Sequence, residues 1–244
     1  MPESGMVPRF YVDEPLRAGG VCTLPEETAH HAIHVLRLRE GEPVMLFNGR
    51  GGEFSARIAS IQRLKIAIDL LEHRAVERES PLRITLVQGV SAGEKMDSTV
   101  RKAVELGAAE VQPVLAARSV ARPKGERAEN RRAHWQKVVI AACEQCGRNR
   151  IPEVHPMIAV SEYRGGAAVK IVLSPQSRQP LSKLPLQGSG FVIAAGPEAG
   201  FTAEEEASLV DAGFVPASLG PRVLRTETAA VAALAALSAL RGDS

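Results

Sequence analysis

A glycine-containing loop in the last quarter of the chain has the residue types best suited to bind a ligand. It reads Gly196-Pro-Glu-Ala-Gly200-Phe, follows the apolar run 191–195 and precedes a capping box at 202–205. A glycine lets the backbone approach a ligand closely or adopt a positive φ. Ligands of open α/β sheets bind beyond the carboxyl ends of strands, so this loop is placed for binding. It matches neither the dinucleotide nor the P-loop pattern, and the alternative is a plain strand-to-helix turn.

A second loop, 218–228, has a similar place after the last predicted strand. It reads Ser-Leu-Gly-Pro-Arg-Val-Leu-Arg-Thr-Glu-Thr, and either Thr226 or Thr228 can cap the final helix. That helix has seven alanines among residues 229–240, and such small side chains permit close approach of another element or of a second subunit. Two such loops at one end of a sheet predict a binding site there.

Two other clusters could hold a metal ion, and the pattern argues against both. His30 and His34 are one helical turn apart, but no HExxH pattern and no further histidine cluster completes a site. Cys143 and Cys146 lie within a predicted helix, whereas redox pairs need a helix N-terminus, and Cys22 is the only other cysteine. We therefore expect buried cysteines and no metal.

Composition excludes several classes of protein. The chain has 244 residues, of which 45% are hydrophobic and 24% charged, as in a soluble globular protein. No apolar run approaches the length of a bilayer span, and the start lacks a hydrophobic signal core. Three cysteines argue against a disulfide framework. We expect a cytoplasmic protein without contact to membranes.

The positive charge is concentrated in one segment. The formal net charge is only +2, yet residues 118–150 contain nine Lys or Arg and three Glu. Phosphate backbones attract such a stripe, because binding releases their counterions. The alternative is a solvated helix face.

The first 72 residues predict a small β-rich module. Residues 43–47 and 52–61 flank an Asn-Gly-Arg-Gly turn and predict a hairpin, and 66–71 predicts a further strand. Helical spacing covers 26–38, and the charged segment 73–81 is a plausible linker.

From residue 82 the pattern changes to alternating strands and helices. Strands are predicted at 84–87, 111–115, 169–173, 191–195 and 215–219. Helices are predicted at 96–106, 130–146, from Thr202 to before Gly213, and at 226–240. This order predicts an α/β class with a parallel sheet covered on both faces.

These motifs resemble a known family. GPEAGF and SLGPRVLRTETA are similar to the two C-terminal motifs of SPOUT-type RNA methyltransferases, and in particular to the ribosomal RNA small subunit methyltransferase E family. Further similar segments are PRFYV at 8–12, HHAIHVLRLREGEPVMLFNGRGGEFSARI at 30–58, KMD at 95–97, AVELG at 103–107 and AACEQ at 141–145. One departure is Ala199, where the family has glycine.

The resemblance implies a fold and a reaction. The fold is a small PUA-like β-barrel domain at 1–73, followed by a SPOUT-type α/β parallel-sheet domain at 74–244 with a C-terminal trefoil knot. The reaction is methylation of a uridine N3 in 16S rRNA of the small ribosomal subunit, with uracil 1498 as the family's site. The donor is S-adenosyl-L-methionine, and no metal is needed.

The resemblance also implies residues that bind the cofactor in a bent pose. They surround the loops after residues 173, 195 and 217, with the backbone of 219, 223 and 224 reading the adenine. The implied residues are Leu173, Gly196, Pro197, Glu198, Gly200, Ser218, Leu219, Gly220, Val223, Leu224 and Thr226.

The acceptor nitrogen is a weak nucleophile while it is protonated, so catalysis needs a base or a group that stabilises the developing anion. We assign the second role to Arg225, a fixed cation beside the donor methyl. Glu198 and Glu227 are candidate bases, although Glu227 also suits the N-terminus of its helix.

Arginines of both domains are expected to hold the RNA backbone. The candidates are Arg9, Arg37, Arg118, Arg122, Arg148 and Arg150. Phosphate contacts position a substrate without specifying its sequence, so we expect recognition of folded RNA in the assembled small ribosomal subunit. The resemblance and the alanine-rich last helix predict a homodimer.

Two alternatives stay open. One is a methyltransferase of the same fold acting on another RNA. The other is an RNA-binding or ribosome-assembly protein with a vestigial cofactor pocket. A nucleotide-dependent oxidoreductase lacks support, because no dinucleotide fingerprint follows a predicted strand.

Overall fold

The computed structural model describes residues 7–120, 122–166 and 169–242. The chain divides into two compact units. The N-terminal unit comprises residues 1–79 together with 143–151, and the C-terminal unit comprises 80–142 together with 152–244. The domain division after residue 73 stays a prediction, and it does not include the return of segment 143–151 to the N-terminal unit.

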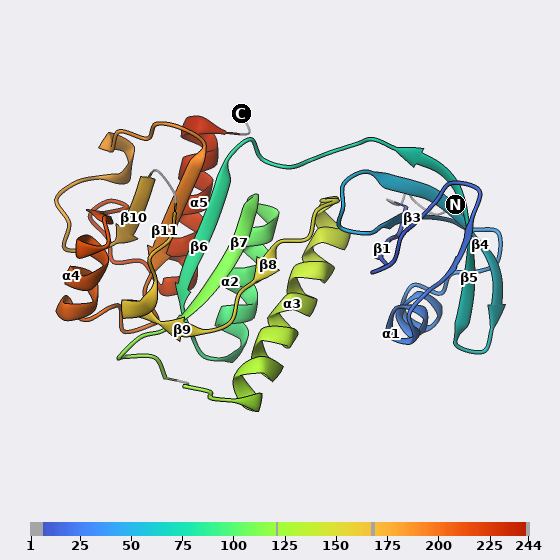
Figure 1. Cartoon of the computed structure of the whole chain (residues 1–244), viewed down its shortest axis with the longest axis horizontal. Coiled ribbons are helices and arrows are strands. Elements are labelled where there is room, and N and C mark those ends of the chain that lie inside the picture. The colour runs from blue at the N-terminus through green and yellow to red at the C-terminus, as the bar shows by residue number, and fades with distance from the viewer. Residues whose placement is uncertain (1–6, 121, 167–168, 243–244) are drawn as a thin grey trace. The chain divides into compact units, whose positions relative to one another are not determined.

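The N-terminal unit is built on a mostly antiparallel sheet with the order β1-β3-β4-β5-β2 (Figure 1). Only β1 pairs in parallel, with β3. The predicted hairpin is confirmed, since β3 and β4 pair antiparallel around the turn. The elements are β1 (Arg9–Tyr11), β2 (Val21–Thr23), α1 (Glu26–His30), the π-helical turn η1 (His31–Val35), β3 (Pro43–Phe47), β4 (Glu53–Gln62) and β5 (Lys65–Arg74).

The helix predicted at 26–38 is shorter and less regular than expected. The α-helix α1 ends at His30 and continues as the π-helical turn η1, in which the N–H of Leu36 donates to the His31 carbonyl. Arg37 then adopts a φ of 56°, which stops any helix. Ala29 and Ala32 are buried, but Leu36 is exposed, so the predicted apolar face ends one turn early.

A buried carboxylate organises the N-terminal unit. The side chain of Glu53 is only 4% exposed, and it accepts hydrogen bonds from Arg9 and from Arg78 at 2.9 Å. Arg9 also donates to Asn149 Oδ1 at 2.6 Å, and Asn149 Nδ2 donates to the Val76 carbonyl at 2.6 Å. Burial raises the pKa of Glu53, but the two guanidinium groups outweigh it and hold the pKa below its usual value. This network ties the segment around Asn149 to the sheet.

Replacing the buried carboxylate should destabilise the protein. Glu53→Gln leaves Arg9 buried without its counter-charge, and we expect the free energy of unfolding to fall by about 3–5 kcal/mol at pH 7. The pKa of Glu53 is lower in the folded protein than in the unfolded chain, where it is about 4.3. The ionised carboxylate therefore stabilises the fold fully above the unfolded pKa, and this stabilisation is lost as the pH falls through the folded pKa. The measurement is urea unfolding by circular dichroism at pH 7 and at pH 3, where the difference should shrink.

The matched control is Asp69→Asn, which breaks an ion pair with Arg57 whose side chains are 55% and 36% exposed. It should change the free energy of unfolding by less than about 1 kcal/mol. Equal effects of the two substitutions would contradict the role of Glu53.

The C-terminal unit contains a parallel sheet, as predicted. Within the described residues its order is β12-β10-β11-β6-β7-β8, with β9 pairing with β7, and every pair is parallel. The strands are β6 (Arg83–Gly89), β7 (Ala108–Leu115), β8 (Glu153–Val154), β9 (Ile158–Ala159), β10 (Val169–Leu173), β11 (Gly190–Ala195) and β12 (Val215–Ala217). The helices are α2 (Gly93–Glu105), α3 (Glu126–Cys146), η2 (Val160–Glu162), η3 (Leu181–Lys183), α4 (Ala203–Asp211) and α5 (Thr226–Arg241).

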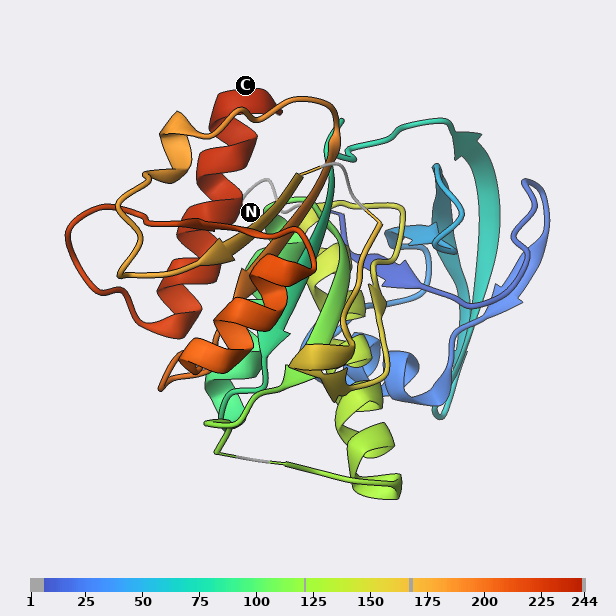
Figure 2. The same cartoon turned by 60° about the vertical axis from the view of Figure 1, so that its left-hand side comes forward.

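Helices cover both faces of this sheet, which confirms the predicted layers (Figures 1 and 2). On one face, Leu234 of α5 and Ala103 of α2 belong to the same core as Ile193 of β11. On the other face, Leu209 of α4 belongs to a second core with Val192 of β11. Successive strand residues therefore point to opposite cores, so β11 reads as a continuous apolar run.

The helix ends agree with the sequence in one case and differ in another. The predicted capping box is confirmed, since Thr202 Oγ1 accepts from the Glu205 N–H and the Glu205 carboxylate accepts from the Thr202 N–H. The prediction that Thr226 or Thr228 caps the last helix is wrong. Arg225 is the N-cap residue, and the Thr226 hydroxyl donates instead to the Gly196 carbonyl.

Two distant loops meet beside β12. The Ser218 N–H donates to the Gln179 carbonyl, and the Leu181 N–H donates to the Ser218 carbonyl, both at 2.9 Å. The trefoil knot stays a prediction.

Over the described ranges, no helix has the length and apolar character to cross a membrane.

Candidate functional site

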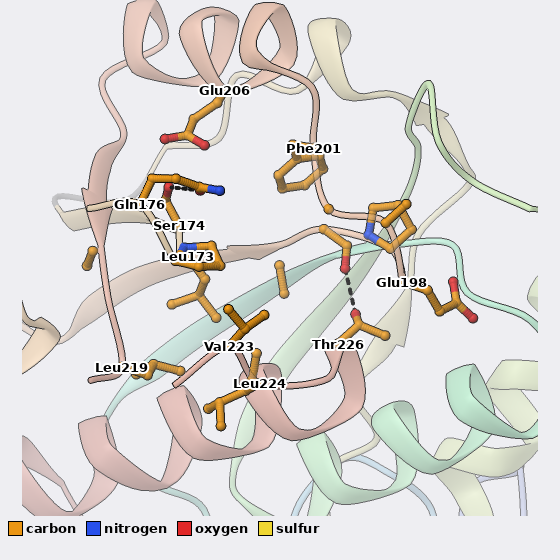
Figure 3. Close-up of a pocket in the computed structure, with 18 of the residues that line it drawn as sticks. Leu173, Ser174, Gln176, Glu198, Phe201, Glu206, Leu219, Val223, Leu224 and Thr226 are labelled. Atoms are coloured by element: carbon orange, nitrogen blue, oxygen red, sulfur yellow. Dashed lines mark hydrogen bonds between the residues drawn. The ribbon is translucent and has the colours of Figure 1, made fainter. Parts of the chain in front are cut away.

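A pocket of about 290 Å³ lies at the carboxyl ends of β10, β11 and β12 in the C-terminal unit (Figure 3). Its walls are the loops that follow these three strands, together with the first turns of α4 and α5. This is the edge of a parallel sheet at which ligands bind. The lining residues are Arg118, Leu173, Ser174, Pro175, Gln176, Ala195, Gly196, Pro197, Glu198, Ala199, Gly200, Phe201, Glu206, Ala217, Leu219, Gly220, Arg222, Val223, Leu224, Thr226 and Ala229.

The loop after β11 is held against neighbouring backbone. A Cβ atom added to Gly89 would lie 2.4 Å from the Pro197 nitrogen, and one added to Gly196 would lie 2.8 Å from the Phe201 nitrogen. Gly200 takes the left-handed conformation, with a φ of 71°, and its N–H donates to the Pro197 carbonyl at 2.8 Å. Ala199 is not among the residues with positive φ, so it occupies its place without backbone strain.

The Thr226 side chain connects the two predicted loops. Its hydroxyl donates to the Gly196 carbonyl at 2.5 Å and accepts from Gln88 Nε2 at 3.1 Å. Gln88 is fully buried at the end of β6 and its Nε2 also lies 3.3 Å from the Gly196 carbonyl. Among the described residues, Gln88 Oε1 has no partner. Strand β6, the loop after β11 and helix α5 therefore share one hydrogen-bonded centre.

Apolar side chains form one part of the pocket wall. Leu173 ends β10, and Leu219, Val223 and Leu224 come from the loop after β12. Figure 3 shows these four side chains gathered on the same side of the pocket. Val223 is 80% exposed, which is unusual for a large apolar residue beside a pocket. Such a wall suits a flat, weakly polar ring.

The Glu198 side chain is directed away from this apolar group (Figure 3). Its Oε1 accepts from the Ala92 N–H at 3.0 Å and lies 3.5 Å from Lys95 Nζ. Burial raises the pKa of Glu198, but the Ala92 N–H and the Lys95 charge outweigh it and lower the pKa overall. A carboxylate with a lowered pKa is a weak proton acceptor. The geometry therefore favours a structural role for Glu198, which connects the loop to the start of α2, over the role of a catalytic base.

The loop after β7 carries two of the basic residues, of which Arg118 lines the pocket. Arg118 Nη1 donates to the Ala199 carbonyl at 3.1 Å, and Arg122 donates to the carbonyls of Ala116, at 3.1 Å, and Ala117. Both arginines are exposed. Glu205 accepts from the Ala117 N–H at 2.6 Å, which fixes this loop to α4.

The predicted cofactor residues lie together at this pocket, with one exception. The residues that line it are Leu173, Gly196, Pro197, Glu198, Gly200, Leu219, Gly220, Val223, Leu224 and Thr226. Ser218 is buried and hydrogen-bonded to Gln179 instead, so it supports the wall from behind. Arg225 is exposed at the start of α5 and is not among the lining residues.

Two of the predicted RNA-binding arginines need correction. Arg9 is 7% exposed and bonded to Glu53, and Arg148 is 6% exposed and bonded to Glu79. A buried, paired guanidinium does not offer its charge to phosphate. Arg37 and Arg150 of the N-terminal unit are exposed, as are Arg118 and Arg122.

Several residues that line the pocket, among them Gln176 and Glu206, were not predicted from the sequence. Ser174, Pro175 and Gln176 directly follow β10, so the rule that selected the loop after β11 could have found them. Glu206 carried no such signal, because three successive acidic residues begin α4 and favourable interaction with the helix dipole accounts for all of them.

The histidine and cysteine clusters show no site geometry. The rings of His30 and His34 lie 4.5 Å apart, and across the described parts of the chain no group of three His, Cys, Asp or Glu could hold a metal ion. Burial raises the pKa of the Cys143 thiol to about 12, so at neutral pH it is not a thiolate. Cys146 is half-buried, and Cys22 is buried like Cys143.

Comparison with known proteins identifies the class. Residues 78–238 match the family model of RNA methyltransferase domains, and residues 24–71 match that of RNA methyltransferase PUA domains. The chain therefore contains an RNA methyltransferase domain, which forms the pocket, and a PUA domain that precedes it.

The particular family follows from individual relatives. A protein named Ribosomal RNA small subunit methyltransferase E from Buchnera aphidicola is 34% identical, and the match covers 97% of this chain and 98% of the relative. The protein of that name from Bacillus subtilis is 32% identical, and the match covers 96% of this chain and 99% of the relative. A Neisseria gonorrhoeae protein of that name, solved with S-adenosyl methionine bound, is 39% identical, with a TM-score of 0.90 over 98% of this chain and 99% of that chain. A Legionella pneumophila protein described as a methyltransferase, solved with its cofactor SAM, is 36% identical, with a TM-score of 0.95 over 98% and 100%. The chain belongs to the ribosomal RNA small subunit methyltransferase E family.

Removing the Thr226 hydroxyl should loosen the pocket's centre. Thr226→Val keeps the shape and β-branching of the side chain but leaves the Gly196 carbonyl and Gln88 without this partner. We expect the free energy of unfolding to fall by about 1–3 kcal/mol in urea denaturation. Thr228→Val, at an exposed position of the same helix turn, is the control and should change it by less than about 0.5 kcal/mol. Similar losses in both variants would argue against the bridge.

Proposed function

We propose that this protein methylates ribosomal RNA of the small subunit, at N3 of one uridine, with S-adenosylmethionine as the methyl donor. The observation that carries the proposal is the pocket at the carboxyl ends of β10, β11 and β12, lined by the two loops that mark the family. Solved relatives that are 36% and 39% identical bind this cofactor. The uridine and its N3 atom come from the resemblance alone.

The pocket residues fit the cofactor. The apolar wall of Leu219, Val223 and Leu224 suits an adenine ring, and the loop backbone beside it supplies polar groups that read its edge. At Gly89 and Gly196 the backbone packs too closely for any side chain, so the loop lies directly against the end of β6. S-adenosylmethionine supplies a methyl group already activated by its sulfonium, so the chain needs no nucleophile of its own.

The remaining chemical task is the acceptor's proton. Uracil N3 attacks readily only after it loses this proton, and a nearby cation lowers the cost of that loss. Arg225 is the exposed cation at the first turn of α5, next to the pocket residues Leu224 and Thr226. We assign Arg225 to stabilise the negative charge that develops on the uracil oxygens. Glu198 is already engaged with Ala92 and Lys95, so we do not assign it as the base, and the N3 proton passes to solvent.

The RNA surface consists of exposed arginines in each unit. Arg37 and Arg150 serve in the N-terminal unit, and Arg118 and Arg122 serve beside the pocket. The assembled small ribosomal subunit, which presents folded RNA, is the proposed substrate form. We also propose a homodimer, because α5 is rich in alanine and its small side chains permit close approach of a second subunit. Sedimentation equilibrium at micromolar concentration measures the oligomeric state, and a monomer would contradict this proposal.

One alternative has lost the feature that favoured it. A vestigial pocket would be favoured if alanine at position 199 distorted the loop, and Ala199 adopts no strained conformation. A different RNA substrate remains the competing hypothesis, and the experiment below separates it from our proposal.

The test uses S-adenosylmethionine with a labelled methyl group. It is offered to assembled small subunits and to naked 16S rRNA, both from cells that lack this protein, and the nucleosides are then analysed. We expect label in N3-methyluridine at one site, with more from the assembled subunit. Label in another nucleoside, or none from either substrate, would overturn the proposal.

The role of Arg225 has a separate test. Arg225→Ala should lower kcat by about 10²–10³-fold, as expected for loss of one group that stabilises a developing anion, while cofactor affinity stays within about twofold. The measurements are single-turnover methyl transfer and calorimetric binding of S-adenosylmethionine. Arg241→Ala, at the other end of α5, is the control and should keep full activity. An Arg225→Ala protein that methylates at the wild-type rate would exclude the assignment.

The proposed RNA surface predicts a change in salt dependence. Arg37→Ala should reduce the slope of log affinity against log salt by about one, because one phosphate contact is lost. Filter binding to 16S rRNA between low and moderate salt measures the slope. Arg57→Ala is the control, since Arg57 pairs with Asp69. An unchanged slope for Arg37→Ala would place the RNA elsewhere.

A further inference from the structure

The charged side chains that line the pocket differ in whether they have partners. Glu198 is bonded to Ala92 and Lys95, and Arg118 is bonded to the Ala199 carbonyl. Glu206 is a second carboxylate in the lining, and among the described residues its side chain has no hydrogen bond or ion pair. A partly buried carboxylate at a pocket wall, without a protein partner, is available to a ligand.

The position of Glu206 in α4 separates it from its acidic neighbours. Glu204 is exposed at the surface of the helix. Glu205 completes the capping box with Thr202 and accepts from the Ala117 N–H. Glu206 alone of the three lines the pocket. The helix dipole favours any acidic residue in this turn, but it does not explain why one of them faces the cavity.

Polar groups gather at the same end of the pocket as Glu206. Ser174 Oγ lies 3.2 Å from Gln176 Oε1, and both residues follow directly after β10. Figure 3 shows the Glu206 carboxylate pointing from α4 toward the side of the pocket that holds Ser174 and Gln176. Leu219 and Leu224 form the apolar side. The pocket therefore has a polar end that contains one unpaired negative charge.

We propose that Glu206 binds the ammonium group of the amino-acid tail of S-adenosylmethionine, and so positions that tail at the Ser174–Gln176 end of the pocket. This inference rests on the proposed function. An ammonium has three hydrogens to donate and forms short, charge-assisted bonds with a carboxylate. The sulfonium has no such hydrogen. Arg222, which also lines the pocket, offers the opposite charge for the carboxylate of the tail.

The location of Glu206 agrees with a positioning role rather than a catalytic one. Glu206 comes from α4, whereas the proposed anion-stabilising Arg225 begins α5. The tail of the cofactor takes no part in bond making. A contact there fixes the orientation of the donor, which affects binding of every ligand that carries the tail.

The test compares three adenosine ligands, of which two carry the amino-acid tail and one does not. S-adenosylmethionine has the tail, with its ammonium and carboxylate, and the sulfonium. S-adenosylhomocysteine keeps the tail but has a neutral sulfur, and 5′-methylthioadenosine has a neutral sulfur and no tail. Calorimetry measures each ligand with the wild type, Glu206→Gln and Glu204→Gln. Glu206→Gln should bind the first two ligands about tenfold or more weakly and the third within about twofold. Glu204→Gln is the matched control from the same helix turn and should bind all three like the wild type.

Each other outcome overturns the assignment in a different way. A loss confined to S-adenosylmethionine would place Glu206 at the sulfonium. An equal loss for all three ligands would indicate a structural role, and thermal unfolding of Glu206→Gln would then show the damage. No loss would mean that the carboxylate stays in solvent. Failure of the wild type to bind any of the three would instead reject the proposed function, and this inference with it.

Discussion

The hydroxyl group of Thr226 joins three segments of the C-terminal unit that are far apart in the chain. It donates to Gly196 in the loop after β11, accepts from Gln88 at the end of β6, and belongs to the first turn of α5. The two loops that line the pocket are therefore held to the sheet at one point. The backbone is closely packed here, since neither Gly89 nor Gly196 has room for a side chain, and the apolar wall and the polar end lie around this point.

The sequence predicted those parts of the molecule that depend on local pattern. Apolar runs marked the strands, the glycine loops marked the binding edge, and the Thr202–Glu205 capping box formed as expected. The prediction failed where a side chain had a choice of partners. Thr226 could cap its own helix or bond to a distant carbonyl, and only the tertiary packing favours the second. Glu206 could not be singled out from its acidic neighbours, because its orientation toward the pocket depends on how α4 packs.

The basic residues of 118–150 have two different roles, which a count of charges does not separate. Arg148 pairs with Glu79 inside the N-terminal unit, and Arg132 pairs with Glu129 on its own helix. Arg118 and Arg122 are bonded to backbone carbonyls but stay exposed. Net charge along the sequence therefore overstates the charge that a polyanion can contact.

The return of residues 143–151 to the N-terminal unit has a consequence for how the chain is made. Asn149 supplies Arg9 and Val76 with hydrogen-bond partners inside that unit. During translation, the first 79 residues leave the ribosome long before Asn149 is synthesised. The N-terminal unit is therefore complete only after α3 has been synthesised, and a fragment that ends at residue 79 lacks these partners of Arg9 and Val76.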